Sequence, residues 1–581
     1  MGNTEILATD PATSTWIGSL VGSRWMARLS SLLDRRYGIP VAVALFSALV
    51  FIPYLGAVGL WDPWETHYSE VGRMMIQRND YVHPYWESAY FFSKPALTMW
   101  IQALGMQVVG TNRTPGAVSL YTEWGVRLPF VLLSILGMAL LSLAIARVVN
   151  KRVALAAGFV LSTMPLYFLL TRQAVTDTPF LSMMMCAMAC AIIGQLDATT
   201  QNRTAWWYGF YVFCALSTLA KGLMGFGVPA VVLLLYAFFC VVPWNRPALE
   251  EHLSWPVKSA AARRMIQPVP VLWRQLFAMK LGTGVLVFLA IAAPWYAVMF
   301  AFPGLDDEGK QFWWRFLIQD HLNRLAVGVH TTTPGGTFTY FIEQGGYAIF
   351  PWVGLLPGAL AAISGLRFRS NNKADHLMVI AAIWTIFSFF LVAISATKFH
   401  HYIFPALPGL AILVAVFIDR LWEEGVVAHA GSLILGFVLF VLVGKDLSSN
   451  PKNFTDLFVY NYSRPYPVDL VQRNLSLFNR RTLWAGDVWA GALLLGGAYL
   501  LFEAWVDKAR PVIFRCIAIL ITAAGLAISI SLAARGTISP AKLLGAACLA
   551  SAAYAEFYVV RDFRQIPEER AGLIGFSVLS A

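Results

Sequence analysis

The stretch GLWDPWETHYSEVGR, residues 59–73, follows an apolar run and brings together residue types that can move protons. Asp62 and Glu65 are followed at once by His67 and Tyr68. A carboxylate beside a reacting hydroxyl or amine can act as the general base that takes its proton. Acids are also favoured at the N-terminus of a helix, because they meet the positive end of its dipole. We therefore assign Asp62 and Glu65 as candidate catalytic residues, with helix capping as the alternative.

Cationic side chains recur at the polar ends of later apolar segments. Arginine binds a phosphate as a planar fork and lysine as a point charge, so both suit the phosphate of a lipid. Carboxylates beside them would oppose simple anion binding, which favours group transfer: the cations stabilise a leaving phosphate and an acid serves as base. The predicted donor-phosphate residues are Lys94, Arg172, Lys221, His321, Arg324 and Lys398.

Each of these residues also has a structural alternative. Lys94 could extend toward the lipid headgroups as an anchor, and Arg172 could pair with Asp177 at the interface. The neighbouring His400 and His401 do not readily reach one ion from a helix, so we expect a hydrogen-bonded or interfacial pair and no metal site. The predicted substrate pocket consists of His67, Tyr68, Asp177, His401 and Tyr402.

The composition requires that membrane-spanning helices hold these residues. Of the 581 residues, 58% are hydrophobic and 13% charged, and the mean hydropathy of +0.62 is too apolar for a soluble core of this size. A helix needs about 20 apolar residues to cross a hydrocarbon core of about 30 Å. We predict an all-α polytopic membrane protein with about fourteen spans, near residues 39–58, 124–147, 153–171, 175–196, 206–220, 223–242, 281–301, 342–363, 376–396, 400–418, 428–444, 485–505, 512–533 and 540–559.

The charge pattern excludes several function classes. The net charge of +11 comes from basic residues spread over short connectors, where they set topology or meet anionic lipids, so nucleic-acid binding is not expected. The six cysteines all fall in apolar segments without metal-type spacing, which is typical of buried small hydrophobic residues. A channel or proton-coupled carrier would place ionisable groups in mid-span, whereas most of the predicted spans have no ionisable residue at their centres.

Lysine and arginine concentrate in alternate connectors, and this asymmetry predicts the orientation. Both termini are expected in the cytoplasm, with loops 60–123, 302–341 and 445–484 on the opposite side. We divide the chain into an amphipathic cytoplasmic segment at 1–38, a catalytic transmembrane module at 39–420 and additional C-terminal helices at 421–581. The charged residues gather at the outer ends of the spans, which predicts a working site at the outer membrane face.

Five short motifs follow the acidic first loop in order along the chain. They are YFFSKPALTMWIQALG (90–105), TRQAVTDTPF (171–180), ALSTLAKGLMG (215–225), IQDHLNRLAVG (318–328) and SATKFHHYIFPALPGLAIL (395–413). Together they resemble the GT-C glycosyltransferases, in particular the lipid A aminoarabinose transferases and the protein O-mannosyltransferase-like enzymes. The resemblance extends over roughly residues 35–420.

The resemblance implies an inverting glycosyltransferase. Such an enzyme moves a sugar from a polyprenyl-phosphate donor to a lipid, glycan or protein acceptor at the periplasmic face of the bacterial inner membrane. In that family an acid of the first periplasmic loop sits at the catalytic centre, which here implies Asp62 or Glu65. The alternative is a lipid-linked sugar flippase or transporter without transferase chemistry. No cofactor is required, a divalent metal is left open, and we expect a monomer whose partners are the donor, the acceptor and membrane lipids.

The chain departs from the family pattern at three places. The aminoarabinose transferases read Asp-Glu-x-Arg-Tyr where this chain reads WETHY (64–68), so Trp64 stands in place of the aspartate and His67 in place of the arginine. Ser93 replaces an acid before Lys94, and His401 replaces a tyrosine. The donor sugar and the acceptor therefore stay open.

Overall fold

The structure is a computed structural model that describes residues 37–56, 59–61, 63–109, 122–197, 199–241, 268–328, 338–368, 370–450 and 453. Asp62, the N-terminal amphipathic segment up to residue 36 and the three predicted spans beyond residue 484 lie outside the described residues. The chain divides into two compact units, and the larger comprises Ile39–Arg420 and His429–Pro465. The site described below belongs to this larger unit.

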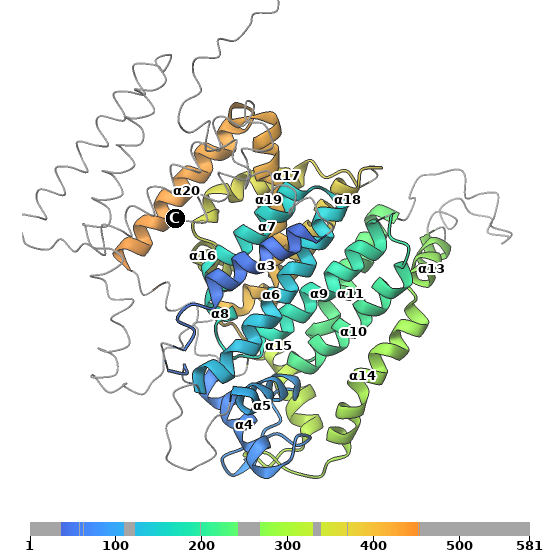
Figure 1. Cartoon of the computed structure of the whole chain (residues 1–581), viewed down its shortest axis with the longest axis vertical. Helices are drawn as coiled ribbons and strands as arrows, with labels where there is room; N and C mark the ends of the chain where they lie inside the picture. Colours follow the sequence, from blue (N-terminus) through green and yellow to red (C-terminus); the bar gives the residue numbers. More distant parts are fainter. Residues whose placement is uncertain are drawn as a thin grey trace, which may run out of the picture. The chain divides into compact units, whose positions relative to one another are not determined.

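The described part of the chain is almost entirely helical (Figure 1). Its elements are α3 (Gly38–Phe51), α4 (Trp64–Arg78), β1 (Tyr85–Trp86), β2 (Ala89–Tyr90), α5 (Leu97–Val109), α6 (Thr122–Val148), α7 (Lys151–Thr163), α8 (Pro165–Thr171), α9 (Asp177–Leu196), α10 (Arg203–Lys221), α11 (Met224–Tyr236), η2 (Ala237–Val241), α13 (Pro268–Ala278), α14 (Leu281–Ala301), η4 (Trp314–Asn323), α15 (Arg324–Ala326), α16 (Phe338–Ala348), η5 (Trp352–Leu355), α17 (Leu356–Ser364), α18 (Lys373–Ile394), η6 (His400–Ala406), α19 (Leu407–Glu424), η7 (Val426–His429) and α20 (Ala430–Ser449).

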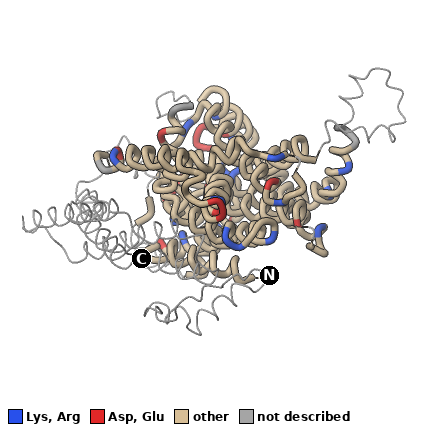
Figure 2. The backbone as a smooth tube through the Cα atoms, turned by 90° about the horizontal axis from the view of Figure 1, so that it is seen from above, with Lys and Arg blue, Asp and Glu red and all other residues tan. Residues whose placement is uncertain are grey.

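The long helices are apolar enough to span a membrane. Among the described residues, seven helices meet this requirement by length and composition, or up to nine if each of two bent helix pairs forms one span. Uncharged residues make up most of these helices (Figure 2). The predicted all-α polytopic architecture is therefore confirmed, whereas the count of about fourteen stays a prediction.

Two predicted continuous spans are broken helices. The pair α7 and α8 bends by 71° at Met164 and Pro165, and the pair α16 and η5–α17 bends by 110° around Pro351. Proline lacks the N–H group that would continue a helix, and it disfavours helical geometry in the residue before it. The apolar runs at 153–171 and 342–363 gave no sign of these breaks. Apolar composition indicates that a segment can lie in lipid, but it does not show whether the helix axis continues in one direction.

Helix α9 is the most buried of the long helices, with 94% of its span inside the protein. It packs against α6 and α10, and these helices lie side by side in Figure 1. A helix that is apolar all round is expected in such a position. Cys186 and Cys190 of α9 and Cys214 of α10 are buried without a disulfide, as the sequence predicted. The first residue of this central helix, Asp177, reaches the site.

The described residues between α3 and α6, at 52–56, 59–61 and 63–109, include two helices and a short hairpin. Helices α4 and α5 pack together, and α5 also contacts α6 and α10, at the lower end of the helices in Figure 1. The two-residue strands β1 and β2 pair antiparallel, with Glu87 in the left-handed region between them. Tyr90 forms an isolated parallel bridge with Asp306, so the segment after α14 is tied to this hairpin.

Candidate functional site

A pocket opens where α4, α9, α10, α15 and η6 converge. Each of these elements contributes a charged or aromatic side chain from one of its ends, which is why residues far apart in the sequence meet. The described residues that line the pocket are Trp64, Tyr68, Lys94, Leu170, Gln173, Val175, Thr176, Asp177, Lys221, Arg324, Phe399, His401 and Tyr402.

Asp177 and Lys221 form an ion pair in this pocket. Asp177 is the first residue of α9 and Lys221 is the last residue of α10, so each charge suits the dipole of its own helix. The His401 Nε2 atom lies 4.0 Å from the second carboxylate oxygen of Asp177. Asp177 is the only carboxylate among the described lining residues, and its cationic partner is Lys221.

Two more cationic residues, Lys94 and Arg324, line the pocket. The Arg324 Nη1 atom donates a hydrogen bond to the hydroxyl of Tyr402 at 3.3 Å. The Lys94 ammonium donates to the carbonyl and the hydroxyl of Ser93, both at 3.0 Å. Burial, together with the positive charge of Arg324, lowers the pKa of Lys94 to about 7. Lys94 is therefore poised to gain or keep a proton when an anion enters.

Aromatic rings also line the pocket. Trp64 stacks with Tyr68 at a centroid distance of 6.2 Å and meets the edge of Phe399 at 6.2 Å. Phe399 in turn contacts Tyr402 at 5.1 Å and His401 at 5.8 Å. Burial raises the pKa of Tyr68, so its hydroxyl stays protonated. Rigid, partly polar rings facing a set of cations can hold a sugar beside its phosphate.

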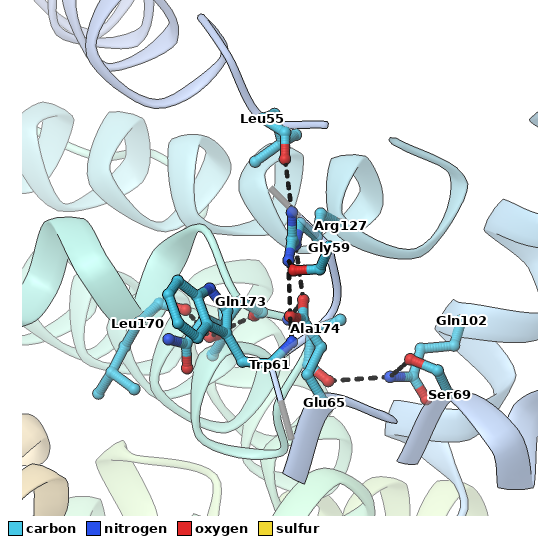
Figure 3. Close-up of polar contacts among 11 residues, drawn as sticks. Leu55, Gly59, Trp61, Glu65, Ser69, Gln102, Arg127, Leu170, Gln173 and Ala174 are labelled. Carbon is cyan, nitrogen blue, oxygen red and sulfur yellow. Dashed lines mark hydrogen bonds and ion pairs between the residues drawn. The ribbon is translucent and has the colours of Figure 1, made fainter. Parts of the chain in front are cut away.

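Glu65 does not reach the pocket, which contradicts its assignment as the catalytic base. Its carboxylate is fully buried and accepts hydrogen bonds from the Arg127 guanidinium at 2.7 and 2.8 Å. It also accepts from the backbone N–H groups of Trp61 at 2.8 Å and Ala174 at 3.0 Å (Figure 3). Four donors occupy the two oxygens, so Glu65 serves as a structural anion that joins the first loop to α6.

Comparison with known proteins agrees with this architecture. Residues 93–273 match the family described as dolichyl-phosphate-mannose-protein mannosyltransferase. The undecaprenyl phosphate-alpha-4-amino-4-deoxy-L-arabinose arabinosyl transferase of Edwardsiella ictaluri is 25% identical over 79% of this chain and 75% of its own length. That of Erwinia tasmaniensis is 26% identical over 64% of this chain, which spans only 58% of the relative's length.

A solved structure has the same fold. The crystal structure of ArnT from Cupriavidus metallidurans bound to undecaprenyl phosphate superposes with a TM-score of 0.57 at 23% identity, covering 91% of this chain and 80% of that one. The chain has an ArnT-like GT-C fold. The family resemblance drawn from the motifs is confirmed. With its apolar helices, the chain is a multi-pass inner-membrane protein.

Three predicted phosphate ligands lie outside the pocket of the ArnT-like fold. Arg172 donates to the carbonyl of Pro53 at 2.7 Å and covers the ring of Phe168, so it neither reaches the pocket nor pairs with Asp177. The Lys398 ammonium, although buried, donates to the carbonyl of Ser395 at 2.6 Å. The assignments of Arg172 and Lys398 to the donor phosphate therefore do not fit the structure.

His321 is also turned away from the pocket. Its Nδ1 lies 2.6 Å from the Phe316 carbonyl, and its Nε2 lies 3.4 Å from the N–H of Leu223. Burial lowers the pKa of His321, and with a donor at Nδ1 and an acceptor at Nε2 the neutral ring satisfies both contacts. The predicted role of His321 in phosphate binding is thus replaced by a contact at the start of α11.

His67, assigned to the substrate pocket, packs elsewhere in the ArnT-like fold. Its ring stacks on Trp86 at 3.9 Å with an interplanar angle of 13° and contacts Phe91 at 4.9 Å. Of the predicted pocket residues, the structure brings together Tyr68, Asp177, His401 and Tyr402. Because α4 is helical, Tyr68 faces the pocket together with Trp64, four positions earlier, whereas His67 points toward the hairpin.

Sequence reasoning missed two charged residues. Asp320 lies between Lys94 and Arg324, and Arg127 neutralises Glu65. Asp320 stands inside the quoted IQDHLNRLAVG motif, so a pairing of the acid with Arg324 four positions later was readable from the sequence. No pattern in the sequence indicated the role of Arg127, because its partner Glu65 lies 62 positions earlier in the chain.

The Lys-Gly pair at the end of α10 has a steric basis. Gly222 has a φ of +100°, and a Cβ built on it would lie 2.6 Å from His321 Nε2. We expect Gly222→Ala to lower the free energy of unfolding by about 1–3 kcal/mol, because the substitution is strained in φ and clashes with a buried ring. Thermal unfolding in detergent measures this loss.

The matched control for this substitution is Gly227→Ala. No atom lies within 4 Å of a Cβ built at Gly227, a helical position of α11. Alanine should therefore be neutral or stabilising there, by up to about 1 kcal/mol. Equal unfolding temperatures for the two variants would contradict the steric role of Gly222.

Proposed function

We propose that the chain is an inverting glycosyltransferase that moves a sugar from a polyprenyl phosphate to a lipid acceptor. One observation carries this: a single pocket gathers Lys94, Lys221 and Arg324 together with aromatic side chains. The curated relatives are named as arabinosyl transferases and support the same reaction class.

The cations fit a departing phosphate. In a transfer with an oxocarbenium-like transition state, the bond between the anomeric carbon and the phosphate oxygen breaks while negative charge grows on the phosphate. Lys94 and Arg324 are desolvated, so their charges act strongly on that developing anion. Lys221 adds to this field, although its pairing with Asp177 moderates it.

The base of this reaction is Asp62. It lies in the acidic first loop, where the family resemblance places the catalytic acid. Glu65 is fully buried and Asp177 is paired with Lys221, so neither offers an open carboxylate. Asp62 takes the proton of the acceptor hydroxyl as its oxygen attacks the anomeric carbon from the face opposite the phosphate.

The pocket faces the periplasm in this proposal, with both termini in the cytoplasm and the chain acting as a monomer. The orientation follows from the lysine and arginine residues of the alternate connectors. A periplasmic pocket suits a lipid-linked donor, because no soluble nucleotide-sugar is needed on that side.

The test uses the purified full chain in proteoliposomes with a panel of radiolabelled polyprenyl-phosphate sugars and a lipid extract as acceptor. Asp62→Asn should lower the transfer rate by about 10²–10⁴-fold, the usual contribution of a general base, with donor binding retained. Transfer at the wild-type rate by this variant would exclude Asp62 as the base. Movement of label across the bilayer without release of polyprenyl phosphate would instead identify a flippase.

A further inference from the structure

Asp320 is a buried carboxylate next to the pocket, and it takes no part in the transfer reaction proposed above. Its side chain is 1% exposed, and it belongs to η4, a π-helix that runs directly into α15. π-Helical segments are rare and occur frequently at functional sites. The position of Asp320 just behind two pocket cations suggests what this segment does.

Three cations surround the Asp320 carboxylate. Its Oδ1 lies 2.6 Å from Arg324 Nη2 and 3.9 Å from Lys94 Nζ, and its Oδ2 lies 3.9 Å from Arg315 Nε. Arg315 precedes Asp320 by one π-helical turn, and Arg324 follows it by four residues, so the local geometry aims both arginines at the same acid. Lys94 joins from the segment before α5.

Lys94 and Arg324 come from two distant parts of the chain and would repel each other without this acid, whereas Arg315 also pairs with Glu308 and Asp306. Removing the charge of one partner in a buried ion cluster leaves the others uncompensated. Asp320 itself is not among the lining residues, so an entering phosphate meets Lys94 and Arg324 and not the acid. The carboxylate thus orients the cations without blocking the anion site.

We propose that Asp320 is a positioning residue that holds Lys94 and Arg324 in place to receive the donor phosphate. This inference rests on the proposed function. Its consequence is that donor binding depends on an acid that never touches the donor.

The pH dependence of donor binding, which Lys94 sets, is a measurement that a purely structural role of Asp320 would leave unchanged. Burial and Arg324 lower the pKa of Lys94 to about 7, while Asp320 opposes that shift. The other charged groups around Lys94 are Lys221, Asp177 and His321. Below this pKa the ammonium is charged and attracts phosphate, so donor affinity is high at low pH and falls as the pH rises through the titration. Loss of Asp320 should lower the pKa of Lys94 further, so the donor affinity should fall at a lower pH than in the wild type.

The experiment measures binding of undecaprenyl methyl phosphate to the full chain in nanodiscs between pH 6 and 9. This phosphodiester keeps a single negative charge over that range, so a pH dependence reports on the protein. We expect Asp320→Asn to shift the midpoint down by about one pH unit and to weaken binding at pH 8 about tenfold, as one unit of pKa change implies. Lys94→Met should abolish the pH dependence.

Glu308→Gln is the matched control. Glu308 pairs with Arg315 at 2.7 Å but is not among the charges that set the pKa of Lys94, so its loss of charge should leave the midpoint unchanged. Wild-type affinity and midpoint in Asp320→Asn, or a midpoint shifted equally in Glu308→Gln, would overturn the inference. If the wild-type chain binds the probe at no pH, the donor site of the proposed function itself fails.

Asp320→Glu covers the case in which the asparagine variant does not fold. The glutamate keeps the charge and displaces it by one methylene group. Its midpoint should stay near that of the wild type, while binding weakens by about threefold or more because the cations are repositioned. Unchanged affinity at every pH would refute the positioning role.

Discussion

Glu65→Gln should destabilise the protein by about 3–5 kcal/mol, the cost of leaving one partner of a buried ion pair alone. The Arg127 guanidinium is 3% exposed and would lose the carboxylate that accepts two of its hydrogen bonds. Its hydrogen bonds to the carbonyls of Leu55 and Gly59 cannot neutralise a charge. Thermal unfolding in detergent, followed by near-ultraviolet circular dichroism, measures the loss.

Two further variants identify the cause of that loss. Glu70→Gln removes an acid from the exposed pair with Arg73 and should change stability by less than about 1 kcal/mol. The double variant Glu65→Gln with Arg127→Met removes the stranded charge and should recover part of the stability. A stable Glu65→Gln protein that has lost only its transferase activity would restore Glu65 as the catalytic acid.

Arg324→Met should lower the rate of sugar transfer by about 10²–10³-fold, as expected for removal of a buried donor from a developing anion. The backbone of Arg324 also holds the segment before η6, since its carbonyl accepts from the N–H of Thr397 at 2.9 Å. Methionine preserves this backbone bond and an unbranched apolar stem, while it removes the whole guanidinium together with its hydrogen bond to Tyr402. Initial rates in proteoliposomes at saturating acceptor measure the effect.

Arg172→Met is the informative control, because the sequence assigned the same role to both arginines. Arg172 contacts Pro53 and Phe168 outside the pocket, so its loss should keep the transfer rate within about threefold of the wild type. If both variants lose activity alike while remaining folded, the pocket does not define the donor site.

Much of the helical architecture was predictable. Membrane helices are read from apolar length, and the predicted spans at 175–196 and 281–301 differ from α9 and α14 by no more than two residues. The direction of the helix axes was not predictable, as the bends at Pro165 and Pro351 show. Apolar side chains satisfy a lipid environment equally well in a straight helix and in a broken one.

Charged residues were harder to assign, and Glu65 shows why. A motif gives residue types in order, and the acid of the WETHY stretch looked as suitable as any other. Whether it faces a pocket depends on Arg127, which lies 62 positions away in the chain. Lys94, Lys221 and Arg324 line one pocket because each ends or flanks a helix at the same end of the bundle.

The sequence by itself determined that this chain crosses the membrane many times, resembles the GT-C glycosyltransferases and carries cations and acids at the ends of its spans. Only the tertiary structure decided which charges meet. Pairing of buried charges depends on distances in space, and those distances made Glu65 a partner of Arg127, Asp177 a partner of Lys221 and Asp320 the shared partner of Lys94 and Arg324.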